Sequence, residues 1–162
     1  MKLLLICGKA ESGKDTFGNI LKEEFESHKK KTCILKITAP LYEYARKYFD
    51  WDGKDSSKPR SLLQELGIEL IQEQLGMKTF LLDRLNDDIK ILDNYYDVGI
   101  ITDGRLINEI EYLKKNFNDV KVIRLYRDKD NDLTPKEKKH ITETDLDINY
   151  EPCFDWNTNL IF

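Results

Sequence analysis

The sequence predicts an α/β protein in which a central parallel sheet is covered by helices on both faces. Short apolar runs, each long enough for one strand, alternate along the chain with longer segments of helical periodicity. Connections of that length favour parallel pairing of successive strands. Polar residues follow directly after several of the apolar runs. Because ligands collect at the carboxyl ends of the strands in such sheets, we expect a site there.

The first apolar run, Lys2 to Cys7, leads into a glycine-rich segment that we call the glycine loop. It reads Gly8-Lys9-Ala10-Glu11-Ser12-Gly13-Lys14-Asp15-Thr16, and apolar residues at helical spacing follow it. The spacing of Gly8 and Gly13 allows backbone N–H groups to surround a phosphate chain, and Lys14 supplies a point charge. The start of the next helix adds its positive end. The loop therefore predicts phosphate binding by a variant of the P-loop.

Asp15 departs from the usual P-loop pattern, in which a Ser or Thr hydroxyl at this position binds Mg²⁺. A carboxylate in the first turn of a helix favours the helix dipole, so Asp15 can be explained as a residue that helps the helix to start. Beside a polyphosphate, however, it would repel the ligand unless a cation lay between them. We favour Asp15 as a ligand of Mg²⁺ or of its waters, and the capping role is the alternative.

Chain length, net charge and cysteine spacing exclude several classes of protein. The chain has 162 residues, the size of one domain, and its net charge of −4 comes from acids and bases that are interspersed throughout. This pattern argues against a nucleic-acid polymer or a membrane as partner. The three cysteines show neither zinc-site spacing nor a disulfide framework. We expect a cytoplasmic protein, in the host cytoplasm if a phage encodes it, and we leave a homodimer open.

Further elements are expected in order after the first helix, which we expect to end near residues 29–31. We expect strands over residues 32–37, 97–102, 120–126 and 159–162, and helices over residues 41–49, 60–75 and 80–92. A further helix is expected to contain Asn108, Glu109 and Glu111 and to end near Lys115. The segment 128–145 is nearly all charged or polar and contains Pro135. We expect it to have little core and to cover a site as a lid, although a solvated surface excursion would have the same composition.

Three polar clusters fall at expected strand ends. They are the glycine loop, Asp103 with Arg105, and Arg124 with Arg127. Phosphoryl transfer requires mainly the alignment of donor and acceptor, together with positive charge around the transferred group. A P-loop, a carboxylate for Mg²⁺ and several arginines would meet this requirement.

Four segments together resemble the deoxynucleoside monophosphate kinases of bacteriophages and their relatives in the P-loop kinase superfamily. They are the glycine loop with its Gly-Lys-Asp-Thr ending, Arg60-Ser61-Leu62-Leu63-Gln64-Glu65-Leu66-Gly67, Thr102-Asp103-Gly104-Arg105 with Asn108-Glu109, and His140-Ile141-Thr142-Glu143. The resemblance implies a three-layer α/β/α P-loop fold over residues 1–162, with acceptor-binding helices at about 38–93 and a lid at about 127–145. It implies transfer of the γ-phosphoryl group of ATP to a nucleoside monophosphate, with Mg²⁺.

The resemblance also implies roles for individual residues. Residues Gly8 to Thr16 would bind ATP, with Asp15 on the metal. The catalytic residues would be Lys14, Arg105 and the lid arginine Arg127. The acceptor would contact Arg60, Gln64, Asp103, Arg105, His140 and Glu143.

The chain departs from the family after Gly67, where Ile68 and Gln72 replace the usual threonine and arginine. It also has Leu106-Ile107 in place of an aromatic-proline pair, and it stops at Phe162, where relatives continue toward the adenine pocket. Two other hypotheses therefore stay open. One is a P-loop kinase for another phosphorylated acceptor, like phosphomevalonate or dephospho-coenzyme A kinases, and the other is a nucleotide-binding module without turnover.

Overall fold

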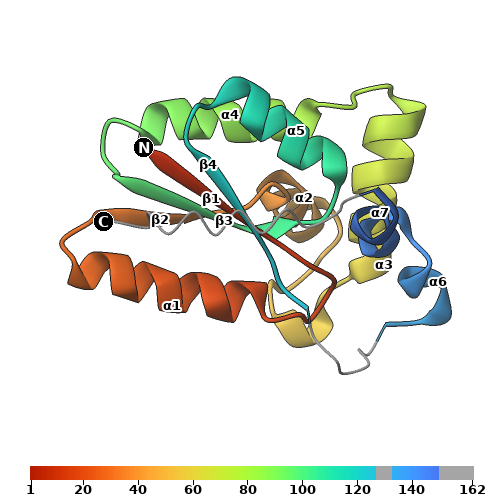
Figure 1. The fold of residues 1–162 in the computed structure, drawn as a ribbon. Helices are drawn as coiled ribbons and strands as arrows, with labels where there is room; N and C mark the ends of the chain where they lie inside the picture. Colours follow the sequence, from red (N-terminus) through yellow and green to blue (C-terminus); the bar gives the residue numbers. More distant parts are fainter. Residues whose placement is uncertain (127–132, 150–162) are drawn as a thin grey trace.

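The computed structural model describes residues 1–126 and 133–149, which form an α/β fold (Figure 1). The described strands are β1 (Lys2–Cys7), β2 (Thr32–Leu35), β3 (Val98–Gly104) and β4 (Val120–Arg124). They form one parallel sheet in the order β2-β3-β1-β4. The strand that precedes the glycine loop is therefore an inner strand, with β3 and β4 on either side of it.

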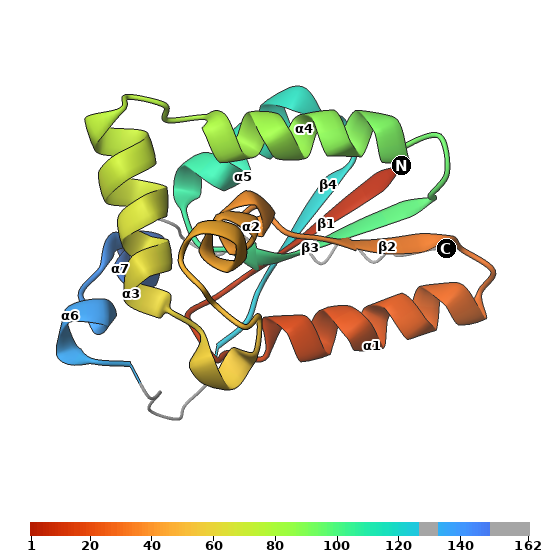
Figure 2. The ribbon, with the colours of Figure 1, turned by 180° about the vertical axis from the view of Figure 1, so that it is seen from behind.

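Helices cover both faces of this sheet, as predicted. The first half of the chain contains α1 (Lys14–Ser27), α2 (Ala39–Tyr48), the short 3₁₀ turn η1 (Asp55–Ser57), α3 (Arg60–Gln64) and the π-helix η2 (Glu65–Gln74). The second half contains α4 (Phe80–Leu92), α5 (Ile107–Asn116), α6 (Pro135–Lys138) and α7 (Ile141–Asn149). Helix α1 lies against one face, and α4 and α5 lie against the other (Figures 1 and 2).

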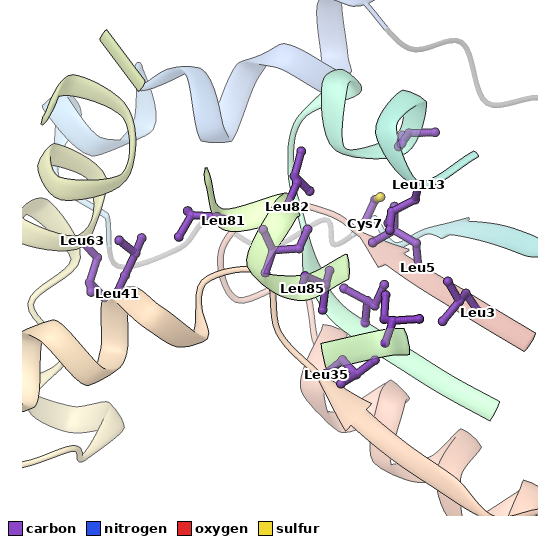
Figure 3. Packing of buried hydrophobic residues seen from close by; sticks show 14 of the residues in the cluster. Leu3, Leu5, Cys7, Leu35, Leu41, Leu63, Leu81, Leu82, Leu85 and Leu113 are labelled. Carbon is purple, nitrogen blue, oxygen red and sulfur yellow. The ribbon is translucent and has the colours of Figure 1, made fainter. Parts of the chain in front are cut away.

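The alternation of side chains along β1 produces two separate cores. Leu4 and Ile6 pack with Phe25 of α1. Leu3 and Leu5 belong to a larger cluster on the opposite face, which continues through the leucines of α4 toward α2 and α3 (Figure 3). Because both faces of β1 are buried, the strand is apolar throughout, as is usual for an inner strand of a parallel sheet.

Several element boundaries differ from the sequence prediction: α2 begins at Ala39, β3 continues to Gly104 and β4 ends at Arg124. Two further differences bear on the site. Strand β2 ends at Leu35 rather than at residue 37, because the backbone N–H groups of Ile37 and Thr38 donate to the Asp103 carboxylate instead of to a strand. The single helix expected over residues 60–75 is one turn of α-helix followed by the π-helix η2. At this wider helix Gly67 approaches α2, where a Cβ would lie 3.0 Å from the Leu41 side chain.

The segment after β4 is better packed than its composition predicts. Within its described part, the side chains of Leu133, Glu137, Glu143, Asp145 and Leu146 are buried. Among residues 133–145, Leu133 is the only buried apolar side chain, so the segment has little apolar core, but three of its acidic side chains are buried against hydrogen-bond donors. Residues 127–132, which include Arg127, and the expected strand 159–162 lie outside the described residues.

None of the helices described for the chain is both long and apolar enough to cross a bilayer.

Candidate functional site

A cavity of about 460 Å³ opens at the carboxyl edge of the sheet. Its lining comes from the glycine loop, the β2–α2 connection, the chain from η1 to η2, the end of β3, and α7. The larger hydrophobic core reaches this cavity, because Leu41, Leu63 and Leu81 belong to that core and also line the cavity (Figure 3). The cavity thus has a polar side at the glycine loop and an apolar wall from α2, α3 and α4, and its size suits a small-molecule ligand.

The glycine loop has the backbone that its glycines predict. Gly13 adopts φ 88°, in the left-handed region that favours glycine, and it directly precedes α1. A Cβ on Gly8 would lie 2.8 Å from the carbonyl oxygen of Leu125, so this position has no room for a side chain. The first N–H groups of α1 have no acceptor within the helix. They lie at the N-terminal end of the helix, beside the cavity. This is a suitable environment for an anion.

The Lys14 side chain folds back onto the first residues of the glycine loop. Its side chain is buried, and its ammonium group donates to the carbonyl oxygens of Gly8 at 2.7 Å and Lys9 at 2.6 Å. Burial, with a smaller contribution from the nearby Arg105, lowers the pKa of Lys14 to about 8. The ammonium group has three donors, so two are used by the loop and one is left for a ligand.

Asp15 joins the start of α1 to the ends of two strands. Its Oδ1 atom accepts hydrogen bonds from Thr102 Oγ1 at 2.6 Å and from Lys36 Nζ at 2.8 Å. Burial would raise the pKa of Asp15, but the hydrogen bonds from Lys36 and Thr102 outweigh it and hold the pKa below its usual value. The carboxylate is therefore ionised and lines the cavity at the position where the sequence predicts a ligand of Mg²⁺.

The donor set fits Mg²⁺ that is shared with a substrate. Within the described ranges, no group of three or more acidic, His or Cys side chains could hold a metal ion by itself. Mg²⁺ is commonly bound through one or two carboxylates together with substrate phosphates and water. Asp15 is placed to be such a carboxylate, next to the N-terminus of α1.

Arg60 reaches the glycine loop from α3. Its Nη2 atom donates to Glu11 Oε1 at 2.6 Å, and its Nη1 atom is buried without a hydrogen-bond partner in the described residues. An unused guanidinium donor at a cavity wall suits a phosphate or carboxylate ligand. Gln64, one helical turn further on, lines the same cavity and donates to Thr142 of α7.

Asp103 and Arg105 stand together at the end of β3, but they have different partners. Both oxygens of Asp103 accept hydrogen bonds from the β2–α2 connection, including one from Thr38 Oγ1 at 2.6 Å. Asp103 thus holds that connection while it lines the cavity. The Arg105 guanidinium forms an ion pair with Glu143 of α7. Roles for Asp103 and Arg105 in acceptor binding stay predictions.

Four predicted residues within the described ranges are not among those that line the cavity: Gly8 and Lys9 of the glycine loop, Arg124 and His140. Arg124 extends under α7, where its guanidinium donates to the Leu146 carbonyl oxygen and pairs with Asp147. His140 precedes α7, and its Nδ1 atom lies 3.0 Å from Thr142 Oγ1. Burial lowers the pKa of His140, so the imidazole is neutral near pH 7.

Sequence reasoning missed three residues that shape the site. Lys36 and Lys58 both line the cavity, and both ammonium groups lie over the ring of Tyr42, at 5.8 Å and 4.7 Å from its centroid. Lys36 could have been found, because it follows an apolar run at a strand end, as Asp103 does. Lys58 and Tyr42 carry no such local signal, since they meet only when the chain between α2 and α3 folds back.

Comparison with models of known protein families and with curated proteins finds no match to this chain. A functional assignment therefore depends on the chemistry of the cavity.

Proposed function

We propose that the protein is an ATP-dependent kinase of nucleoside monophosphates, with deoxynucleoside monophosphates as the expected acceptors. The observation that carries the proposal is the shared cavity. Lys14, Asp15, Arg60 and Arg105, which come from three distant parts of the sequence, all line it. Donors for phosphate, a carboxylate for a metal ion and two arginines are the groups that phosphoryl transfer requires.

The proposal assigns the glycine loop, as a P-loop, to the phosphates of ATP and the apolar wall to the acceptor. Leu41, Tyr42 and Leu63 give that wall the character expected around a nucleoside. An oxygen of the acceptor's phosphate attacks the γ-phosphorus of ATP, and the bond from that phosphorus to the bridging oxygen breaks to release ADP. Lys14 and the N-terminus of α1 hold negative charge in place during this step.

Asp15 would be a ligand of Mg²⁺ bound with ATP, and the ion would neutralise part of the phosphate charge. The proposal includes a three-layer P-loop fold and a lid formed by the segment 127–145. Arg127 would be the lid arginine.

The test is release of ADP from Mg²⁺-ATP in the presence of each natural nucleoside and deoxynucleoside monophosphate in turn. Turnover with one or more monophosphates, absent from a Lys14→Ala protein prepared identically, is the expected result. The variant controls for contaminating kinases. ATP binding without turnover in the presence of any acceptor would instead indicate a nucleotide-binding module.

A second acceptor class has one observation in its favour. Ile68 and Gln72, which replace the threonine and arginine usual at these positions in the kinases that the chain resembles, both line the cavity. An acceptor of different chemistry, such as phosphomevalonate or dephospho-coenzyme A, would explain that change. Both compounds belong in the same ADP-release panel, and activity with one of them alone would replace the nucleotide assignment.

A further inference from the structure

Glu143 is a buried acid whose two carboxylate oxygens are both engaged by the polar side of the cavity. Its side chain is 3 % exposed. Oε2 accepts the backbone N–H of Ala10 in the glycine loop at 2.9 Å, and Oε1 forms the ion pair with Arg105. One side chain of α7 therefore connects the loop after β1 to the arginine after β3.

Arg105 needs such a partner to have a defined position. An arginine side chain loses much rotational freedom when it is fixed, and an unfixed guanidinium contributes less to a reaction that depends on alignment. The Arg105 side chain is 26 % exposed at the cavity, and the ion pair with Glu143 gives it a direction. A carboxylate that accepts from both the loop and the guanidinium also sets the spacing between them.

The attachment of α7 does not depend on Glu143. Asp145 accepts the backbone N–H of Ile107 at 2.7 Å, and Asp147 pairs with Lys9 at 2.5 Å and with Arg124. These contacts hold α7 on α5, on the glycine loop and on the end of β4. A role for Glu143 limited to docking α7 would therefore duplicate contacts that the helix already has.

We propose that Glu143 is a positioning residue, which fixes the Arg105 guanidinium against the glycine loop for phosphoryl transfer and does not itself bind the acceptor. This inference rests on the kinase function proposed above. It changes the role that the sequence resemblance implies for Glu143, because this side chain is almost fully buried, with both oxygens engaged by Ala10 and Arg105, and presents little surface to an acceptor.

The first test replaces Glu143 by Gln, which keeps the shape and removes the charge. We expect kcat to fall roughly tenfold, because Arg105 is no longer held in one orientation. We expect ATP to bind roughly threefold more tightly, because a negative charge has been removed beside the phosphate-binding loop. Glu143→Asp keeps the charge but withdraws it by one methylene group, so kcat should fall without tighter ATP binding. The aspartate variant also provides a result if the glutamine variant fails to fold.

Asp147→Asn is the matched control. Asp147 lies one turn further along α7 and its side chain is 40 % exposed, so the control removes an acid from the same helix away from Arg105. We expect kcat of this control to stay within about twofold of the parent value. ATP should bind somewhat more tightly, as in Glu143→Gln, because Asp147 pairs with Lys9 of the glycine loop. A fall in kcat equal to that of Glu143→Gln would show that any loss of charge from α7 has the same effect, which would overturn the proposal.

A double-mutant cycle separates positioning from a structural role. In an Arg105→Ala protein, Glu143→Gln should change kcat by less than about twofold, since the group that it positions is missing. An equal fall in both backgrounds would overturn the proposal in favour of a structural role. Tighter ATP binding with unchanged or increased kcat would also overturn it, because Glu143 would then be a counter-ion that competes with the substrate.

Nuclear magnetic resonance of the Arg105 side chain tests the proposal without turnover. A guanidinium held by a carboxylate gives separate Nη signals because rotation about its Nε–Cζ bond is slow. We expect separate signals in the parent protein and averaged signals in Glu143→Gln. If no monophosphate supports turnover, the proposed function fails, while these signals still decide whether Glu143 fixes Arg105. Averaged signals in the parent protein would overturn the positioning role.

Discussion

The loop that follows β1 and the helices that follow β4 meet at the same edge of the sheet with opposite chemistry. The glycine loop presents backbone N–H groups and the Lys14 ammonium to the cavity. Residues 133–149 present buried carboxylates, of which Glu143 contacts the loop itself. The chain carries a net charge of −4, yet its cavity suits an anion. The acids of residues 133–149 orient the cations near the glycine loop and balance their charge.

Burial of these acids is tolerated because each one has donors. Glu137 accepts from Thr134 at its backbone N–H and its hydroxyl group, and from Ser61 of α3 at 3.2 Å. The hydrogen bonds from Thr134 keep the pKa of Glu137 below its usual value. Figures 1 and 2 show α6 and α7 beside α3 in both views, in agreement with this contact. A charged segment can therefore be an ordered wall of the site when the rest of the domain supplies donors.

Lys14→Ala, in the glycine loop, should have the largest effect on turnover. We expect turnover to fall at least about a hundredfold, because the variant removes a fixed positive charge from the glycine loop, which is proposed to bind the phosphates. Thermal unfolding should change little, because the ammonium group bonds mainly to the loop's own carbonyl oxygens. Lys22→Ala, further along α1, is the control. Near-normal turnover of a folded Lys14→Ala protein would contradict the P-loop assignment.

Arg60→Ala should act on the acceptor rather than on ATP. We expect KM for the monophosphate to rise by roughly ten- to a hundredfold, because Arg60 lines the cavity and its Nη1 atom has no hydrogen-bond partner in the described residues. KM for ATP should change by less than about threefold. Steady-state kinetics with each substrate varied in turn is the measurement, and Arg46→Ala, an exposed arginine of α2, is the control. Weakened ATP binding alone would mean that the two subsites have been assigned in reverse.

Asp15→Asn should raise the Mg²⁺ concentration required for half-maximal activity by about tenfold, because the amide keeps the shape of the ligand and loses its charge. Titration of activity with Mg²⁺ at fixed ATP is the measurement. Asp87→Asn, on the exposed side of α4, controls for the change in net charge. An unchanged titration curve would favour the alternative in which Asp15 only stabilises the start of α1.

Asp145→Ala tests the contribution of a buried acid of α7 to the stability of the fold. It leaves the backbone N–H of Ile107 without its carboxylate acceptor, so we expect the free energy of unfolding to fall by about 1–3 kcal/mol. Urea unfolding measures this loss. ATP affinity of the folded protein should stay within about twofold of the parent value, since Asp145 does not line the cavity. A large loss of ATP affinity without loss of stability would show that α7 contributes to ATP binding as well as to packing.

Glu109→Gln should have the smallest effect. The quantity that it changes is the pH dependence of the free energy of unfolding. Burial raises the pKa of Glu109 from 4.5 to about 7, although the backbone N–H groups of Arg105 and Leu106 oppose that rise. The folded protein then binds this proton more tightly than the unfolded chain, so the contribution of Glu109 to stability falls as pH rises from about 4.5 to about 7. Urea unfolding at pH 5 and pH 7.5 should show a smaller difference in the variant. The same difference in both proteins would contradict the prediction.

Local sequence determined the strand–loop–helix unit and the residues of the glycine loop. Strand β1, the glycine loop and α1 follow one another as their residue pattern predicts, and Gly8 and Gly13 adopt positive φ within the loop. The boundaries of α4 were likewise predicted correctly from the periodicity of Phe80 to Leu92, since an amphipathic helix is encoded within its own length.

Tertiary structure alone decided which distant groups complete the site. Ala10 and Glu143 are 133 positions apart, and Asp15 and Thr102 are 87 apart, so no local pattern relates them. Arg124 and Arg105 looked equivalent at their strand ends, but β4, the outermost described strand on its side of the sheet, carries its arginine under α7, whereas β3 carries Arg105 to the cavity. Strand order depends on how apolar surfaces pack between elements, and spacing along the chain does not encode that packing.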